Sequence, residues 1–178
     1  MVSEPKRRSF LRMMAGLPLM RVIQSSAGAA QGRAQFVAAG HDQSDAPVGH
    51  GFSRLDYKVS SRSTAGGLFV MEHINLVKGG GPPLHLHHEQ EEWFYLLEGE
   101  MIVQVGGERT RLQSGDSVLA PRNIPHAYLY VAEKPGRLLI AFTPAGKIEA
   151  FFRDVRPHDA KVFREYGMEL IGPPMSQD

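Results

Sequence analysis

Short stretches that alternate apolar and polar residues recur along most of this 178-residue chain, with turn-forming residues between them. From Gly66 onward eight such stretches follow one another, over residues 68–76, 84–87, 92–97, 101–105, 109–112, 117–120, 127–131 and 137–142. Gly106-Gly107 has the composition of a hairpin turn. Many short strands at this spacing pair antiparallel and form a sandwich or a jelly-roll barrel. We therefore expect an all-β domain.

Three histidines and a glutamate in this region have the residue types and the spacing of a metal site. Side chains two residues apart on a strand share a face, so His85 and His87 should converge on one side. Glu92, at the start of the next strand, could face them across the strand pair, and His126 lies further along. Three imidazoles and one carboxylate are a plausible set of protein ligands for one divalent transition metal. The alternative is that these are ordinary surface histidines.

The neighbouring residues leave the acidic ligand ambiguous. Glu91 competes with Glu92, because the loop after His87 breaks the strand alternation. His88 should face outward, whereas the parity of its strand does not decide whether His73 lines a pocket or faces solvent. Polar or irregular segments hold the remaining histidines, which carry no signal: His41, His50 and His158.

The spacing of these residues resembles the first sequence motif of the cupin superfamily. That motif is Gly, five residues, His-x-His, three or four residues, Glu, six residues and Gly. Every position is matched, by Gly79, His85, His87, Glu92 and Gly99. The six residues before Gly99 favour Glu92 over Glu91 as the acidic ligand.

The second cupin motif is matched less completely. It is Gly, five residues, Pro, one residue, Gly, two residues, His, three residues and Asn, and this chain matches it at Gly115, Pro121 and His126. Asn123 stands at the second glycine, a mild change because Asn tolerates positive φ better than most residues. Tyr130 stands at the final Asn. The resemblance covers residues 66–144 and implies a cupin type-2 domain, with a double-stranded β-helix (jelly-roll) barrel.

A different pattern follows Pro144. Apolar residues over 148–155 follow a helical period, and residues 160–166 could form a second short helix that ends at Gly167. Residues 165–174 resemble the tail of single-domain cupins similar to quercetin dioxygenase. The expected organisation is therefore a cupin barrel over 51–145, starting with an edge strand over 52–59, and a C-terminal helical extension and tail over 146–178. Since cupins of this type are often dimers, the resemblance also implies a homodimer.

The expected site favours an oxidative reaction on a small molecule. Four protein ligands leave one or two positions on the metal for substrate, O₂ or water. Phe94 shares the strand parity of Glu92, while Tyr128 and Tyr130 share that of His126, so these three should line an aromatic substrate pocket. We expect a metal-dependent dioxygenase, similar to quercetinases, that acts on a small aromatic or enolisable substrate, with Glu92 as a catalytic proton acceptor.

Two other functions fit the same ligands. One is a non-catalytic exported protein that uses its metal to hold a small oxygenated ligand. The other is a hydrolase or isomerase that uses Zn²⁺. The ligand set does not select the metal, because imidazole-rich sites accept Fe, Mn, Ni, Cu, Co and Zn to differing degrees.

Residues 1–30 resemble a twin-arginine export signal, whose core is Arg-Arg-x-Phe-Leu-Lys. The match is Arg7-Arg8-Ser9-Phe10-Leu11-Arg12, followed by a short apolar stretch and by small residues for cleavage. The apolar stretch is too short to span a membrane. We expect a periplasmic or secreted protein without a stable membrane span after signal removal; the alternative is a cytoplasmic protein with a disordered basic tail. Residues 31–50 indicate a linker or arm.

Charge and cysteine content exclude several function classes. Removal of residues 1–30 would leave 15 basic and 18 acidic residues, a net charge of about −3. No basic cluster would remain to follow phosphates, so nucleic acid is not an expected partner. The chain contains no cysteine, which excludes disulfides, thiolate ligands and a cysteine nucleophile.

Overall fold

The computed structural model describes residues 34–44, 48–154, 156 and 158–176. The strands are β1 (Val48–His50), β2 (Ser53–Val59), β3 (Phe69–Leu76), β4 (Pro83–His87), β5 (Glu91–Glu98), β6 (Glu100–Val105), β7 (Glu108–Gln113), β8 (Ser117–Ala120), β9 (His126–Tyr130), β10 (Gly136–Thr143) and β11 (Met168–Pro174). The helices are the short 3-10 helix η1 (Ser61–Thr64), α1 (Ile148–Arg153) and α2 (Ala160–Glu165). The export signal predicted over residues 1–30 lies outside the described residues.

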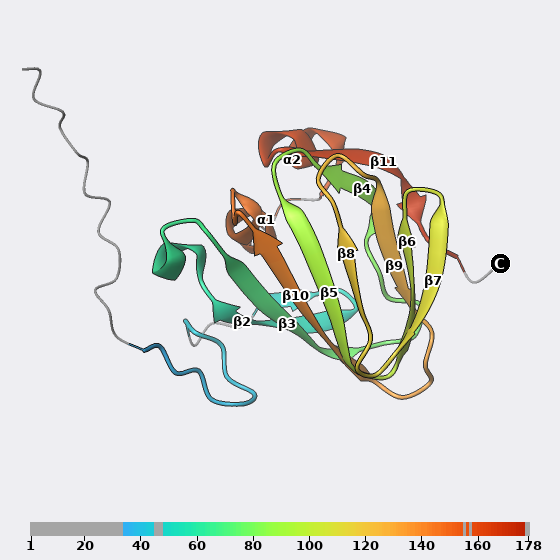
Figure 1. Cartoon of the computed structure of the whole chain (residues 1–178), viewed down its shortest axis with the longest axis horizontal. Helices are drawn as coiled ribbons and strands as arrows, with labels where there is room; N and C mark the ends of the chain where they lie inside the picture. The colour runs from blue at the N-terminus through green and yellow to red at the C-terminus, as the bar shows by residue number, and fades with distance from the viewer. Residues whose placement is uncertain (1–33, 45–47, 155, 157, 177–178) are drawn as a thin grey trace, which may run out of the picture.

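The strands form two antiparallel sheets that enclose one core (Figure 1). The first sheet has the order β1-β2-β3-β10-β5-β8, and the second has the order β11-β4-β9-β6-β7. Some strands that are consecutive in sequence, such as β4 and β5, lie in different sheets, whereas others, such as β6 and β7, pair within one sheet. The all-β jelly-roll barrel expected from the strand pattern is confirmed.

Two edges of the sheets differ from expectation. The segment that was expected to be an edge strand is β2, but β1 pairs with it over three residues, so that prediction is wrong. The predicted tail contains a strand, β11, which pairs with β4. Prolines at the end of β11 are compatible with this position, because an edge strand needs ladder hydrogen bonds on one side only.

Strand alternation determines which side chains enter the barrel. Along β5, residues at even positions from Glu92 to Leu96 are buried, and the residues between them are partly exposed. The turn from β5 to β6 requires glycine, because Gly99 has a φ of +106° and an added Cβ would overlap the Tyr130 ring. Asn123 has a φ of +62°, which explains how it replaces the motif glycine.

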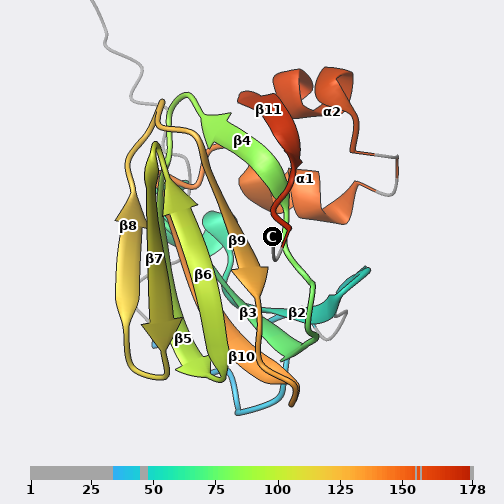
Figure 2. The ribbon, with the colours of Figure 1, turned by 90° about the vertical axis from the view of Figure 1, so that its right-hand side faces the viewer.

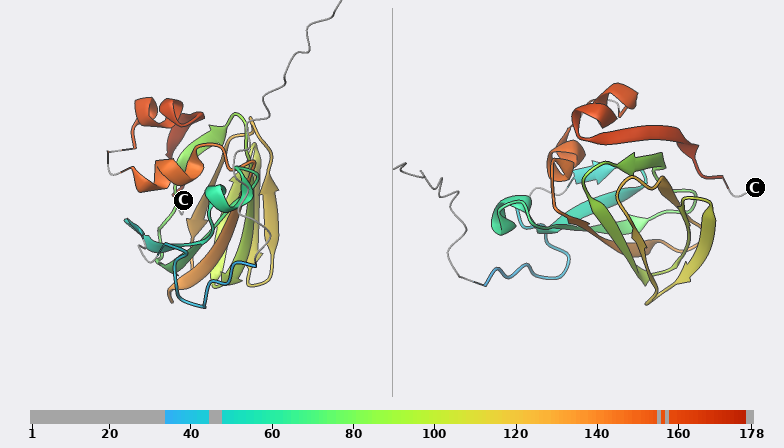
Figure 3. Two further views of the ribbon diagram at one scale, coloured as in Figure 1. Left: turned by 90° about the vertical axis from the view of Figure 1, so that its left-hand side faces the viewer. Right: turned by 45° about the horizontal axis from the view of Figure 1, so that its top comes forward.

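The C-terminal segment closes one side of the barrel. Helices α1 and α2 lie beside β4 and β11 (Figure 2), and both views of Figure 3 show the same arrangement. Asp159 begins α2 by accepting hydrogen bonds from the backbone N–H groups of Lys161 and Val162. The two helices bury apolar side chains, among them Phe151 and Phe163. The described residues contain no helix that is both long and apolar enough to cross a membrane.

Candidate metal centre

The four predicted ligands meet inside the barrel, between the two sheets. His85 and His126 are directly opposite each other on the neighbouring strands β4 and β9. His87 follows two residues later on β4 and faces the same way. Glu92 comes from β5 of the other sheet, so it faces the histidines across the barrel interior. The expectation that it faces them across a pair of neighbouring strands is wrong.

The ligand atoms of these residues are close enough for one ion to bind them all. One nitrogen or carboxylate oxygen from each lies within 4.8 Å of the others, and all four residues are buried. Two ligands on opposite sides of an ion with bonds of about 2.1 Å would stand about 4.2 Å apart. Small side-chain rotations would therefore be enough to complete the coordination shell.

Hydrogen bonds to backbone carbonyls orient two of the imidazoles. Nδ1 of His85 lies 2.8 Å from the carbonyl oxygen of Pro83, and Nδ1 of His126 lies 2.9 Å from that of Ile124. Since a carbonyl only accepts, each Nδ1 carries the proton and donates it. In the neutral rings the lone pairs are then on the Nε2 atoms, which is the orientation that metal-binding histidines use.

His87 supplies a further sign that a cation fits here. It is 1% exposed, and neither of its ring nitrogens makes a hydrogen bond with the described residues. Its Nε2 lies 3.1 Å from Oε2 of Glu92, and Nε2 of His126 lies 2.8 Å from the same oxygen. A buried polar group without a partner costs about 1–3 kcal/mol. A metal ion among these atoms would remove that cost, so the residues fit a single metal site.

The charges and pKa values of the cluster also favour a bound cation. Burial acts to raise the pKa of Glu92, but the hydrogen bond to His126, the close contact with His87 and the charges of both rings hold it well below its usual range. Burial, reinforced by His126 and His87, lowers the pKa of His85 to about 3, so its ring is neutral at pH 7. Burial acts to lower the pKa of His126, but Glu92 outweighs it and the pKa is raised. A metal cation bound among these residues would balance the negative charge of Glu92.

The ambiguity between the two glutamates is resolved by their surroundings. Glu91 forms an ion pair with Arg122 at the surface, with an oxygen–nitrogen distance of 2.5 Å, and it does not face the histidines. Glu92 is 4% exposed and belongs to the cluster. His88 is half exposed and points away from the cluster, as predicted.

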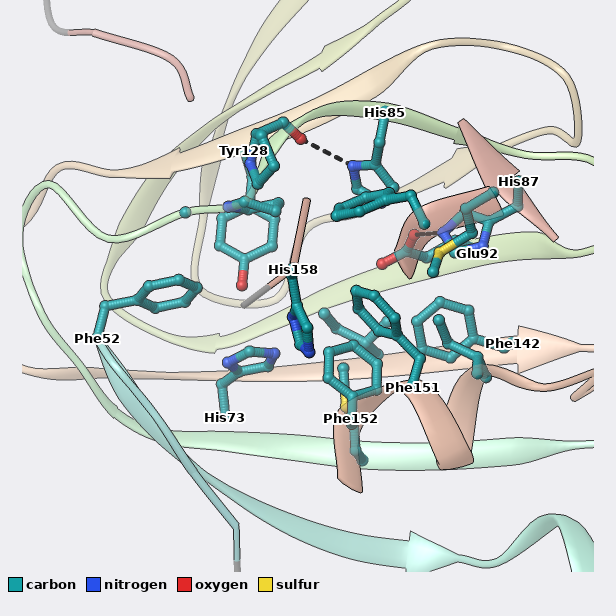
Figure 4. Close-up of a pocket in the computed structure, with 18 residues that line it drawn as sticks. Phe52, His73, His85, His87, Glu92, Tyr128, Phe142, Phe151, Phe152 and His158 are labelled. Carbon is teal, nitrogen blue, oxygen red and sulfur yellow. Dashed lines mark hydrogen bonds and ion pairs between the residues drawn. The ribbon is translucent and has the colours of Figure 1, made fainter. Parts of the chain in front are cut away.

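An aromatic cavity of about 210 Å³ leads to the cluster (Figure 4). His85, His87 and Glu92 line one part of it. Phenylalanines supply much of the wall: Phe52, Phe142, Phe151, Phe152 and Phe163. The volume is below the approximately 300–1,000 Å³ that is common for drug-sized ligands, which favours a small molecule.

Only one of the three predicted pocket residues lines this cavity. Tyr128 is part of its wall, but the described lining includes neither Phe94 nor Tyr130. Phe94 packs between His126 and Tyr128, with ring-centroid distances of 6.1 and 5.9 Å. The Tyr130 hydroxyl donates to the carbonyl of Lys134. Strand parity placed both side chains inside the barrel correctly, but it does not report depth along the barrel, and both belong to the packed core.

Two further histidines belong to the cavity wall: the sequence left His73 open between a pocket wall and the exposed face, and it gave no signal for His158. His73 is buried on β3 and its Nδ1 lies 2.7 Å from the hydroxyl oxygen of Ser53. His158 precedes α2 and stacks on Phe151, with ring centroids 4.1 Å apart. The helical period over 148–155 could have indicated Phe151 as an inward residue, but an isolated histidine in an irregular segment gives no such signal.

Comparison with known proteins gives consistent results. The family described as "Cupin domain" matches residues 72–142. Quercetin 2,3-dioxygenase of Bacillus subtilis is 30% identical over 113 residues, which are 63% of this chain and 33% of that protein. The tetracenomycin polyketide synthase protein TcmJ of Streptomyces glaucescens is 28% identical over 121 residues, 68% of this chain and 76% of that protein.

A solved structure supports the same fold. An RmlC-like cupin from Shewanella frigidimarina superposes with a TM-score of 0.54 at 21% identity, over 66% of this chain and 96% of that one. The chain spans about one third of the length of the Bacillus subtilis dioxygenase. At these identities and coverages, the likenesses concern fold and family and leave the reaction open.

Proposed function

Because this chain belongs to the cupin superfamily, we propose that it is a metal-dependent dioxygenase that acts on a small aromatic or enolisable molecule. The observation that carries the proposal is the convergence of three histidines and Glu92 on one point of an aromatic cavity. The partial match to a quercetin 2,3-dioxygenase supports this reaction class over other uses of the same ligands.

His85, His87, His126 and Glu92 would hold one divalent ion of Fe, Mn, Ni, Cu, Co or Zn. When bound, the ion would supply Lewis acidity and a route for electrons between the substrate and O₂. Glu92 offsets one of its two charges, so the site would carry about +1 and attract the oxygen of an enolate or phenolate. As the substrate enters, a carboxylate oxygen of Glu92 accepts the proton of the substrate's enol or phenol hydroxyl group.

The remaining walls orient the substrate and exclude water. The phenylalanine side chains of the cavity offer flat apolar surfaces against which an aromatic ring can stack. Phe151 and Phe163 come from α1 and α2, and Phe163 also contacts His85 with a ring-centroid distance of 5.6 Å. The C-terminal segment therefore shapes the substrate side of the centre.

Oxygen consumption by protein of known metal content tests the proposal. The protein is loaded separately with each metal and assayed with a panel of flavonols and phenolic acids. We expect uptake that His87→Ala abolishes together with metal retention, whereas His88→Ala, the matched exposed control, leaves both unchanged. Activity in metal-free protein contradicts the proposal. Ligand binding without oxygen consumption, whichever metal is loaded, would favour a non-catalytic binding protein. Turnover of Zn²⁺-loaded protein in the absence of O₂ would favour a hydrolase or isomerase.

Export by the twin-arginine route and a homodimeric state also remain proposals. Since that route resembles one that carries folded proteins, the metal would be bound before export. Elemental analysis of the protein recovered from its native compartment tests both the site and the export signal.

A further inference from the structure

A groove of about 570 Å³ lies outside the metal cavity, between η1, the first residues of α1 and the segment before β1. Among the described residues, the groove and the metal cavity have no lining residue in common. Helix α1 separates them, because Phe151 lines the cavity whereas Glu149 and Arg153 line the groove. Hydrogen bonds from Ser60 and Ser61 to Glu149 hold η1 against α1 (Figure 1). The groove is therefore a separate feature of the fold.

Tyr57 supplies the groove with a buried hydroxyl group that has no partner. Its side chain is 1% exposed, and its hydroxyl makes no hydrogen bond with the described residues. The ring packs edge-on against Phe69 of the core, with a centroid distance of 4.9 Å, and the Arg153 guanidinium carbon lies 4.5 Å from the ring centroid. Burial raises the pKa of Tyr57, so the hydroxyl keeps its proton and can donate. Because buried hydroxyls normally have a partner, this donor points to an acceptor that a ligand brings.

Other polar groups of the groove are already paired with one another. The Gln43 side chain donates to the Ser63 hydroxyl and accepts from the backbone N–H of Ser60. Glu149, the one carboxylate among the described residues that line the groove, accepts from both the backbone N–H and the hydroxyl of Ser61. These bonds fix the groove walls. They also occupy the carboxylate oxygens that could otherwise have accepted from the Tyr57 hydroxyl.

The charge of the groove favours an anionic ligand. Three cationic side chains line it, those of Arg62, Lys147 and Arg153, against the single carboxylate of Glu149. Arg153 is 38% exposed and lies 3.8 Å from that carboxylate, a long separation for an ion pair, so its guanidinium can turn toward a ligand and uncover the Tyr57 hydroxyl. We propose that the groove binds the oxyanion group of a small molecule, a carboxylate or a phosphate. The Tyr57 hydroxyl donates to one of its oxygens, and the three cations balance its charge.

Anion titrations followed by NMR test this inference without any turnover. Inorganic phosphate and acetate are each added to the full chain, metal-free and loaded with Zn²⁺, with chloride keeping the ionic strength constant. We expect saturable shifts of the backbone amide signals of residues 60–63 and 146–153 with at least one anion, and the same Kd in both metal states. Tyr57→Phe should weaken this binding at least about tenfold, the loss expected for a hydrogen bond to a charged group. Tyr95→Phe, a partly exposed tyrosine on β5, is the matched control and should not.

A charge variant and the choice of anion complete the test. Arg62→Gln should also weaken the binding, whereas Arg164→Gln, an exposed arginine outside the groove, should not. Without anion, Tyr57→Phe should melt no lower than the wild type, because it removes a hydroxyl that has no partner, so weaker binding would not reflect misfolding. Saturation by phosphate alone identifies a phosphate site, and by acetate alone a carboxylate site. No saturable shift at these residues with either anion, shifts that require Zn²⁺, or an unchanged Kd in Tyr57→Phe would overturn the inference.

Discussion

Replacing His87 with leucine should change the stability of the protein in opposite directions without and with metal. His87 is buried, and its ring nitrogens have no hydrogen-bond partner among the described residues. Removal of such a group should stabilise the metal-free protein by about 1–3 kcal/mol, since leucine is apolar and similar in volume. For a domain of this size, that corresponds to a rise in Tm of roughly 2–12 °C.

With bound metal, the wild-type protein should be more stable than the His87→Leu variant. At a free metal concentration of one thousand times the Kd, binding should stabilise the wild-type protein by about 4.1 kcal/mol, more than the roughly 1–3 kcal/mol that the variant gains without metal, whereas metal should not stabilise the variant. Thermal unfolding by circular dichroism, after dialysis against EDTA and again with added metal, measures both effects. His88→Leu is the matched control, because that side chain is 49% exposed and should change neither Tm by much. A His87→Leu protein that is less stable than wild type without metal would refute the reasoning.

Three further predictions concern residues around the centre. Burial lowers the pKa of His85 to about 3 from an unfolded value of 6.5, so the metal-free protein should lose up to about 1.4 kcal/mol of stability per pH unit as pH falls from 6.5 toward 3. Denaturant titrations at several pH values should show that the free energy of unfolding of His85→Gln depends less steeply on pH than that of the wild type. An equally steep dependence would contradict this prediction. Glu92→Gln should weaken metal binding at least tenfold by calorimetry, whereas Glu91→Gln, which loses only a solvent-screened surface ion pair, should bind metal normally. Phe163→Ala should lower the free energy of unfolding by about 3–5 kcal/mol, and a loss below 1 kcal/mol would mean that α2 does not pack as described.

The sequence predicted the barrel and the metal cluster well because both depend on local rules. Strand alternation places His85 and His87 on one face, and it buries Phe94 and Leu96 on the face of Glu92. The motif spacing then selects Glu92 over Glu91. The strand relations involve neighbours along one strand, whereas the meeting of Glu92 and His126 with the His85–His87 pair joins two sheets and was indicated by the resemblance to the cupin motifs.

The parts that were missed depend on long-range packing. The strand β11 pairs with β4, but its Gly-Pro-Pro end gives it a weak strand signal, and the segment was taken as a tail. His158 enters the cavity only because α1 and α2 return to β4. Tyr130 shows the limit of parity, because an inward side chain can belong to the core far from the site.

The pairing of β11 with β4 also sets an order of events during synthesis. His87 is opposite Met168, a residue that the ribosome adds 81 positions later. Until residues 168–174 are made, β4 presents one unpaired edge, and the walls that α1 and α2 supply are incomplete. The nascent chain thus carries all four candidate ligands long before it can enclose them. Selective retention of a metal at the proposed site would therefore require residues 168–174, and a translation product interrupted before them would expose its histidines to any metal in the cell.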